Sequence, residues 1–91
     1  MCFVDSAFVV YALKNRSGDI RLGLTVSKKI GGAVSRNRAK RVLTAAFREC
    51  APRIKSGYDF VLTARTRILS VKSTDIAAKL MTYLQKADLV D

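Results

Sequence analysis

Apolar residues alternate with polar or small ones in three segments of the chain, and they recur at helical spacing in two others. Residues 6–13 are rich in β-branched and aromatic types, which favours a strand. Alternation divides that strand into two apolar faces: Phe8, Val10 and Ala12 against Val9, Tyr11 and Leu13. We therefore expect cover on both sides of this strand, or one face left open for a ligand.

A second strand is predicted over residues 20–27, with Ile20, Leu22, Leu24 and Val26 on one side. A cluster of turn residues, 15–19, separates it from the first strand, and so short a link favours an antiparallel hairpin. A third strand is predicted from Tyr58 to Ala64. With a helix between them, the second and third strands form a predicted βαβ unit with parallel strands.

The longer helix is predicted to begin at Ala33 or Val34 and to end near Cys50, before Pro52. One arc of it is apolar: Ala39, Val42, Leu43, Ala46, Phe47 and Cys50. The opposite arc is polar: Arg38, Lys40, Arg41, Thr44 and Arg48. After a connector at 68–72, a last helix is expected with Ser73 as N-cap and Asp75 near the positive end of its dipole. Its apolar stripe consists of Ile76, Ala77, Leu80, Tyr83, Leu84 and Ala87.

The length of 91 residues accommodates one domain, residues 1–91. The predicted strands and helices assign this domain to the α+β class. Two cysteines, Cys2 and Cys50, lack the spacing of a zinc site or a redox motif and are interpreted as a chain-end thiol and a core residue. The longest unbroken apolar run, residues 7–13, is too short to span a bilayer. These features predict a soluble, reduced, cytoplasmic protein without a membrane partner.

Positive charge is concentrated in residues 27–41, which contain six cations and no carboxylate. No acidic residue lies between Asp19 and Glu49, and the whole chain carries a net charge of +10. Such an excess is typical of a polyanion partner, and nucleic acid fits better than an anionic membrane surface. The alternative interpretation is that these cations are ordinary solvated positions on an amphipathic helix. The candidate nucleic-acid-binding residues, called the cationic ridge below, are Lys28, Lys29, Arg36, Asn37, Arg38, Lys40, Arg41 and Arg48.

Binding is favoured over catalysis, because the chain contains no histidine and its seven carboxylates are scattered. No serine or cysteine lies in a nucleophile-elbow pattern, and no phosphate-loop pattern is present. The residues therefore disfavour a free-standing nuclease and predict no catalytic residue and no bound metal. Tyr11 has two interpretations: it stacks on an unpaired base from an open sheet face, or it is a core tyrosine with its hydroxyl at the rim.

With these residues in place, the chain resembles the protein component of bacterial ribonuclease P. The resemblance is carried by Phe8-Val9-Val10-Tyr11, by residues 21–31 and above all by residues 33–41, with Arg36-Asn37-Arg38 and Lys40-Arg41 as the most specific part. It continues through Phe47-Arg48-Glu49, Gly57-Tyr58-Asp59 and Ala64-Arg65. It covers residues 7–65 well, and the last helix is similar only in pattern.

The resemblance implies a two-layer sandwich of a small mixed β-sheet and helices, with a left-handed βαβ crossover. It implies that a catalytic RNA subunit, through magnesium ions bound to that RNA, removes the 5′ leader of precursor tRNA, and that the protein itself binds no cofactor. The cationic ridge would then contact the ribonuclease P RNA, and the leader would bind at Val9 and Tyr11. The alternative function is a general ribosome-associated or nucleic-acid-binding protein that uses the same basic helix.

Two departures from the family pattern are visible. The family usually opens with a basic helix bearing aromatic residues, whereas this chain begins almost at the first strand. We therefore expect that helix to be absent or nearly so, and two explanations stay open: the sequence is truncated, or the protein functions with a half-open leader cleft. Gly32 also stands where the family commonly has asparagine, which predicts a weaker N-cap.

Overall fold

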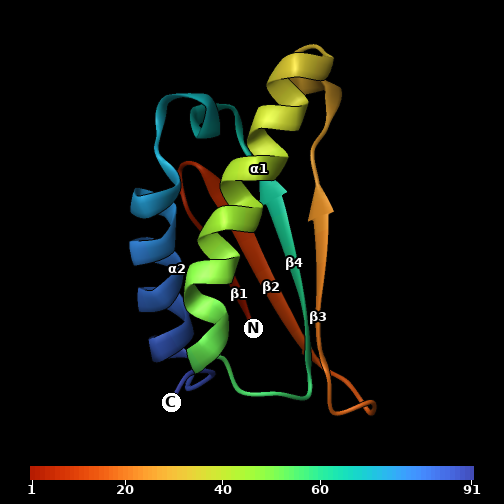
Figure 1. Cartoon of the computed structure of the whole chain (residues 1–91), viewed down its shortest axis with the longest axis vertical. Coiled ribbons are helices and arrows are strands. Elements are labelled where there is room, and N and C mark those ends of the chain that lie inside the picture. The colour runs from red at the N-terminus through yellow and green to blue at the C-terminus, as the bar shows by residue number, and fades with distance from the viewer.

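A four-stranded sheet and two helices form two layers in the computed structural model, which describes residues 1–91 (Figure 1). The strands are β1 (Cys2–Val4), β2 (Phe8–Lys14), β3 (Ile20–Thr25) and β4 (Tyr58–Ala64). The helices are α1 (Ala33–Cys50) and α2 (Ser73–Lys86), and short 3₁₀ turns occupy Lys28–Ile30, Ala51–Arg53 and Thr66–Ser70. The predicted α+β class, three strands and two helices are confirmed; β1 was not predicted.

The order of strands in the sheet is β1-β2-β4-β3, so the predicted hairpin of β2 and β3 is wrong. β4 lies between them, antiparallel to β2 with Tyr11 opposite Val61, and parallel to β3 with Gly23 opposite Val61. In this central position β4 forms hydrogen bonds along both of its edges. The predicted β3-α1-β4 unit with parallel strands is confirmed.

Both helices lie on the same side of the sheet (Figure 1). The side chains of Phe8, Val10 and Ala12 point toward them and are buried, whereas Tyr11 and Leu13 on the other face are exposed. The alternation predicted for this strand is therefore confirmed. Of the two expectations for its apolar faces, the structure supports the second, a face left open.

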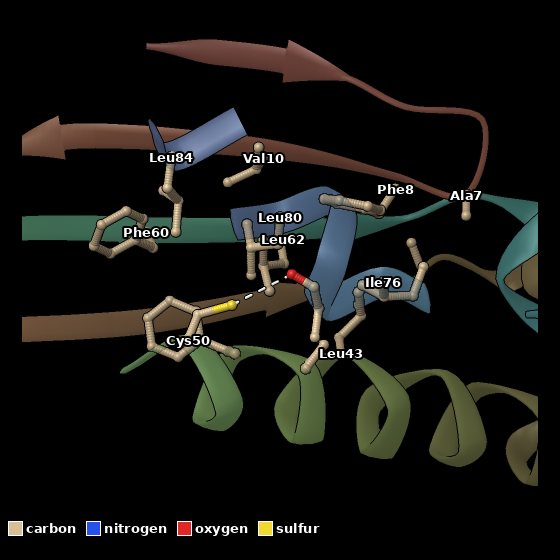
Figure 2. Packing of buried hydrophobic residues seen from close by; sticks show 14 of the residues in the cluster. Ala7, Phe8, Val10, Leu43, Cys50, Phe60, Leu62, Ile76, Leu80 and Leu84 are labelled. Atoms are coloured by element: carbon tan, nitrogen blue, oxygen red, sulfur yellow. Dashed lines mark hydrogen bonds between the residues drawn. The ribbon is translucent and has the colours of Figure 1, made fainter. Parts of the chain in front are cut away.

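The core is formed where the apolar stripes of α1 and α2 meet the inner face of the sheet (Figure 2). Leu43 from α1, Leu80 from α2 and Phe60 from β4 have no exposed surface. Cys50 is also buried and its thiol points at the carbonyl oxygen of Ala77, with an Sγ–O distance of 3.5 Å (Figure 2). Burial, with a smaller contribution from the charge of Glu49, raises the pKa of this thiol. The core assignment of Cys50 is confirmed, and neither cysteine forms a disulfide.

A buried carboxylate joins the first strands to α2. Asp5 is 8% exposed and accepts hydrogen bonds from the Tyr83 hydroxyl at 2.6 Å and from the Ala7 N–H at 2.9 Å. The Lys79 ammonium lies 3.5 Å from the same carboxylate. Burial opposes ionisation, but these donors outweigh it, so the pKa of Asp5 is lowered. The network holds the turn between β1 and β2 against α2.

The start of α2 differs by one residue from the prediction. Ser73 is the first helical residue, and Lys72 occupies the N-cap position. The side chain of Asp75 accepts a hydrogen bond from the Lys72 N–H at 3.4 Å, so its predicted location near the positive end of the helix is confirmed. No helical segment combines the length and the apolar character that crossing a bilayer requires.

Candidate nucleic-acid interface

Most of the cationic ridge lies on the solvent side of α1. Asn37, Arg38, Lys40, Arg41 and Arg48 are exposed along the helix. They are held outward because the opposite side of α1 packs on the sheet and on α2, through Ala39, Leu43, Ala46, Phe47 and Cys50. The apolar stripe therefore fixes both the position of the helix and the direction in which its charges point.

Arg36 is the member of the ridge that is not fully on the solvent side. It is half-buried, and its Nε atom is buried without a hydrogen-bond partner in the protein. The reason is its position on the helix: Leu43 follows two turns later on the same side, so Arg36 borders the buried arc. Arg36 is therefore only partly available to a ligand, unlike the other residues of the ridge on α1.

Lys28 and Lys29 lie next to the start of α1, in the 3₁₀ turn that follows β3. The turn is anchored by Ile30, whose side chain is 4% exposed. Gly31 connects the turn to the helix with a φ of 135°, a conformation that favours glycine, and a Cβ there would lie 3.1 Å from the Cβ of Ser35. This tight link keeps the two lysines beside the first turn of α1.

No carboxylate neutralises the cationic ridge. The three ion pairs of the protein are Arg21–Asp59, Lys55–Asp88 and Lys79–Asp5, all outside the ridge. The first turn of α1 contains no acidic residue, and its N-cap, Gly32, has no side chain to bind the free N–H groups. The absence of a side-chain cap agrees with the weaker cap predicted from this glycine. The positive end of the helix dipole thus adds to the charge of the side chains.

The cations line shallow depressions rather than a flat surface. One hollow of about 340 Å³ is lined by Lys40, Arg41, Thr44, Ala45 and Arg48. A second, of about 240 Å³, lies near the start of α1 between Val26, Ala33, Arg36, Asn37 and Lys40. Arginine offers a planar fork for phosphate oxygens, and lysine a mobile point charge. The ridge is therefore suited to gripping a sugar–phosphate backbone.

The other predicted residues, Val9 and Tyr11, lie on the face of the sheet that no helix covers. We call this the open face; it contains Cys2, Val4, Val9, Tyr11, Leu13, Arg21, Gly23, Thr25, Asp59, Val61 and Thr63. Tyr11 is 45% exposed, and Val9 is half-buried between Val4 and Thr63. Tyr11 is thus no core residue, and the structure leaves its ring available for stacking.

The structure does not bring the open face together with the part of the ridge on α1, because α1 covers the opposite side of the sheet (Figure 1). A further hollow at the ends of β3 and β4 is lined by Ser27, Lys29, Ile30, Ala64, Arg65 and Thr66. Arg65 was not among the predicted site residues, although it directly follows a strand. Its guanidinium donates to the backbone oxygen of Asp5 at 3.0 Å, so it is held at that edge.

The far end of the open face is electrically balanced. Arg21 and Asp59 are opposite each other on β3 and β4 and form two hydrogen bonds, of 2.7 and 3.1 Å. The hydrogen bond from Arg21 is the main reason why the pKa of Asp59 is lowered, and Asn15 adds a second donor at 2.8 Å. Asp59 therefore neutralises Arg21, whereas Lys28 and Lys29 at the other end of the sheet form no ion pair.

Comparison with known proteins agrees with this geometry. A family model described as Ribonuclease P matches residues 2–88. The ribonuclease P protein component of Clostridioides difficile (strain 630) is 36% identical over 88 residues, covering 96% of this chain and 77% of that protein. The component of Clostridium botulinum (strain Loch Maree / Type A3) is 40% identical over 88 residues, covering 96% and 79%.

Two solved structures have the same fold over almost the whole chain. The RNase P protein of Staphylococcus aureus superimposes with a TM-score of 0.81 at 30% identity, covering 100% of this chain and 84% of that one. The RNase P protein of Thermotoga maritima gives a TM-score of 0.80 at 30% identity, covering 94% and 82%. Sequence, fold and the exposed basic helix lead to the same conclusion: this chain belongs to the ribonuclease P protein family.

Proposed function

We propose that this chain is a non-catalytic RNA-binding subunit of ribonuclease P that binds the catalytic RNA through the cationic ridge and the 5′ leader of precursor tRNA through the open face. Membership of the family supports the role as a subunit. The observation that carries the binding proposal is the ridge itself, whose cations form no ion pair with any carboxylate of the chain. Its phosphate partners must come from another molecule.

Contacts between the ridge and phosphate groups would act mainly by neutralising charge. Each arginine or lysine that contacts a phosphate releases condensed counterions, which makes the affinity depend on salt. The same neutralisation lowers the concentration of magnesium that the folded RNA needs. The protein has no cluster of three or more histidine, cysteine, aspartate or glutamate side chains that could hold a metal ion. In this proposal the magnesium ions are bound by the RNA subunit.

Binding of the leader is supported by the open face. A single strand offers unpaired bases, and stacking on an aromatic ring contributes about 1–3 kcal/mol per base. Tyr11 presents its ring on a face that is otherwise apolar or small in its middle rows, with Val9, Val61 and Gly23 around it. Such a surface is sequence-tolerant, which suits a leader that differs from one precursor to another.

Reconstitution tests this function. The protein is mixed with a bacterial ribonuclease P RNA and precursor tRNA at a magnesium concentration too low for the RNA alone to cleave. We expect the protein to restore removal of the leader, and we expect protein without RNA to leave the precursor intact. A protein that binds the RNA but leaves cleavage unchanged would instead support the general nucleic-acid-binding alternative.

The nuclease alternative is tested in the same experiment. A structure similar to this chain is described as a Staphylococcus aureus RNase P protein mutant with defective mRNA degradation activity, at 31% identity and a TM-score of 0.81. Incubation of this protein alone with a messenger RNA and with precursor tRNA distinguishes the two roles. Cleavage that persists through repeated purification would contradict the non-catalytic assignment.

A further inference from the structure

Gly23 lies in the middle of β3, and its position faces the open side of the sheet. Register puts it in one row with Tyr11 and Val61, because Tyr11 is opposite Val61 on β4 and Val61 is opposite Gly23 on β3. The neighbours of Gly23 on the same face of β3 are Arg21 and Thr25, which both carry side chains. Gly23 is exposed, so the row ends in a notch at the edge of the sheet.

The fold itself gives no reason for a glycine at this position. Gly23 is not among the three glycines that have a positive φ. A Cβ built on it would meet only the Cγ2 atom of Val61 at 3.8 Å and the carbonyl oxygen of Phe60 at 3.9 Å, which are ordinary contact distances. Glycine also weakens a strand, because it loses more backbone freedom on folding and packs no side chain. A β-branched residue would suit this position better.

A glycine that weakens its strand without relieving strain often marks the close approach of a ligand. We propose that Gly23 is a specificity-determining residue of the leader site. Because Gly23 has no side chain, a nucleotide of the leader can extend from Tyr11 over Val61 and contact the backbone of β3. Neighbouring strands lie about 4.8 Å apart, so Gly23 is about 10 Å from Tyr11, within reach of the stacked nucleotide or the next one. This inference rests on the proposed function of the open face.

Two variants with increasing bulk test the proposal: Gly23→Ala adds one carbon and Gly23→Val adds three. Each protein is reconstituted with ribonuclease P RNA, and its affinity is measured for a precursor tRNA with a long leader and for one with a single-nucleotide leader. We expect the preference of the wild-type holoenzyme for the long leader to fall in order of bulk, by about tenfold for Gly23→Val, the worth of one stacked base. Affinity for the RNA subunit is expected to be unchanged.

Thermal unfolding of the same variants separates a ligand-binding role from a structural one. Because glycine weakens a strand, Gly23→Val is expected to raise the melting temperature, by about 3 °C for a domain of this size. A lower melting temperature would mean that the fold requires the glycine, and it would overturn the inference. An unchanged leader preference in a stable Gly23→Val protein would overturn it equally. If the wild-type holoenzyme shows no leader preference, both this inference and the proposed leader site are refuted, whereas the proposed role of the ridge is not.

Discussion

The double variant Arg38→Ala/Arg41→Ala is expected to weaken binding to ribonuclease P RNA and to make that binding less sensitive to salt. Both side chains are exposed on the outer side of α1, and neither forms an ion pair. Their removal therefore breaks no ion pair within the protein. Alanine also has a higher helix propensity than arginine, so α1 should remain intact.

The size of the effect follows from counterion release. Each phosphate contact contributes about 0.9 to the slope of log affinity against log salt for a duplex, and about 0.7 for a single strand. Loss of two contacts should therefore reduce the slope by about 1.4–1.8. A slope that is smaller by 1.8 has a clear consequence between 50 and 200 mM salt: the factor by which affinity falls is about 12 times smaller for the variant than for the wild type.

The measurement is a titration of labelled ribonuclease P RNA with protein at several salt concentrations. The matched control is Arg16→Ala/Lys86→Ala, which removes the same two charges from the net +10 but takes them from the β2–β3 turn and the end of α2. We expect the control to keep the wild-type slope. Equal slopes for the wild type and the ridge variant would refute the assignment of α1 as the contact surface. Equal changes in both variants would mean that only total charge matters.

Three further results are expected. Tyr11→Ala should reduce the preference of the holoenzyme for a long leader by about fivefold or more, whereas Tyr11→Phe should preserve it, because the stacking ring is kept. Tyr83→Phe should lower the free energy of unfolding by about 1–3 kcal/mol in urea titrations, because it removes a donor from the buried Asp5 carboxylate. Since the folded pKa of Asp5 is lowered from 3.8, the stability that this group contributes is present above pH 3.8 and is lost as the pH falls through the folded value; Tyr83→Phe should flatten that loss. Leu43→Ala should cost about 2–5 kcal/mol of stability, yet the salt slope of the fraction that remains folded should not change, because Leu43 points away from the ridge.

Local patterns were sufficient for the elements and for the direction of the ridge. The span of α1 and the exposure of Arg38 and Arg41 follow from helical periodicity, since an apolar stripe that must be buried forces the opposite side of the helix into solvent. The exposure of Tyr11 follows in part from the alternation of β2, which assigns it to the face opposite Phe8. The sequence left open whether that face is covered, because the answer depends on where the helices pack. The assignments of residues to RNA and to leader binding stay predictions.

Apart from the parallel pairing of β3 with β4 across α1, which the order of elements predicted, tertiary structure decided which distant parts of the chain are joined. The insertion of β4 between β2 and β3 depends on pairing between segments that short-range turn signals cannot relate, so proximity in sequence wrongly favoured a hairpin. The partnership of Asp5 with Tyr83 spans 78 positions and leaves no local signature. The row that joins Tyr11, Val61 and Gly23 exists only once three strands are in register. Periodicity determines which side of an element is apolar, because it is a property of the local backbone; which elements become neighbours is set by the packing of the whole chain.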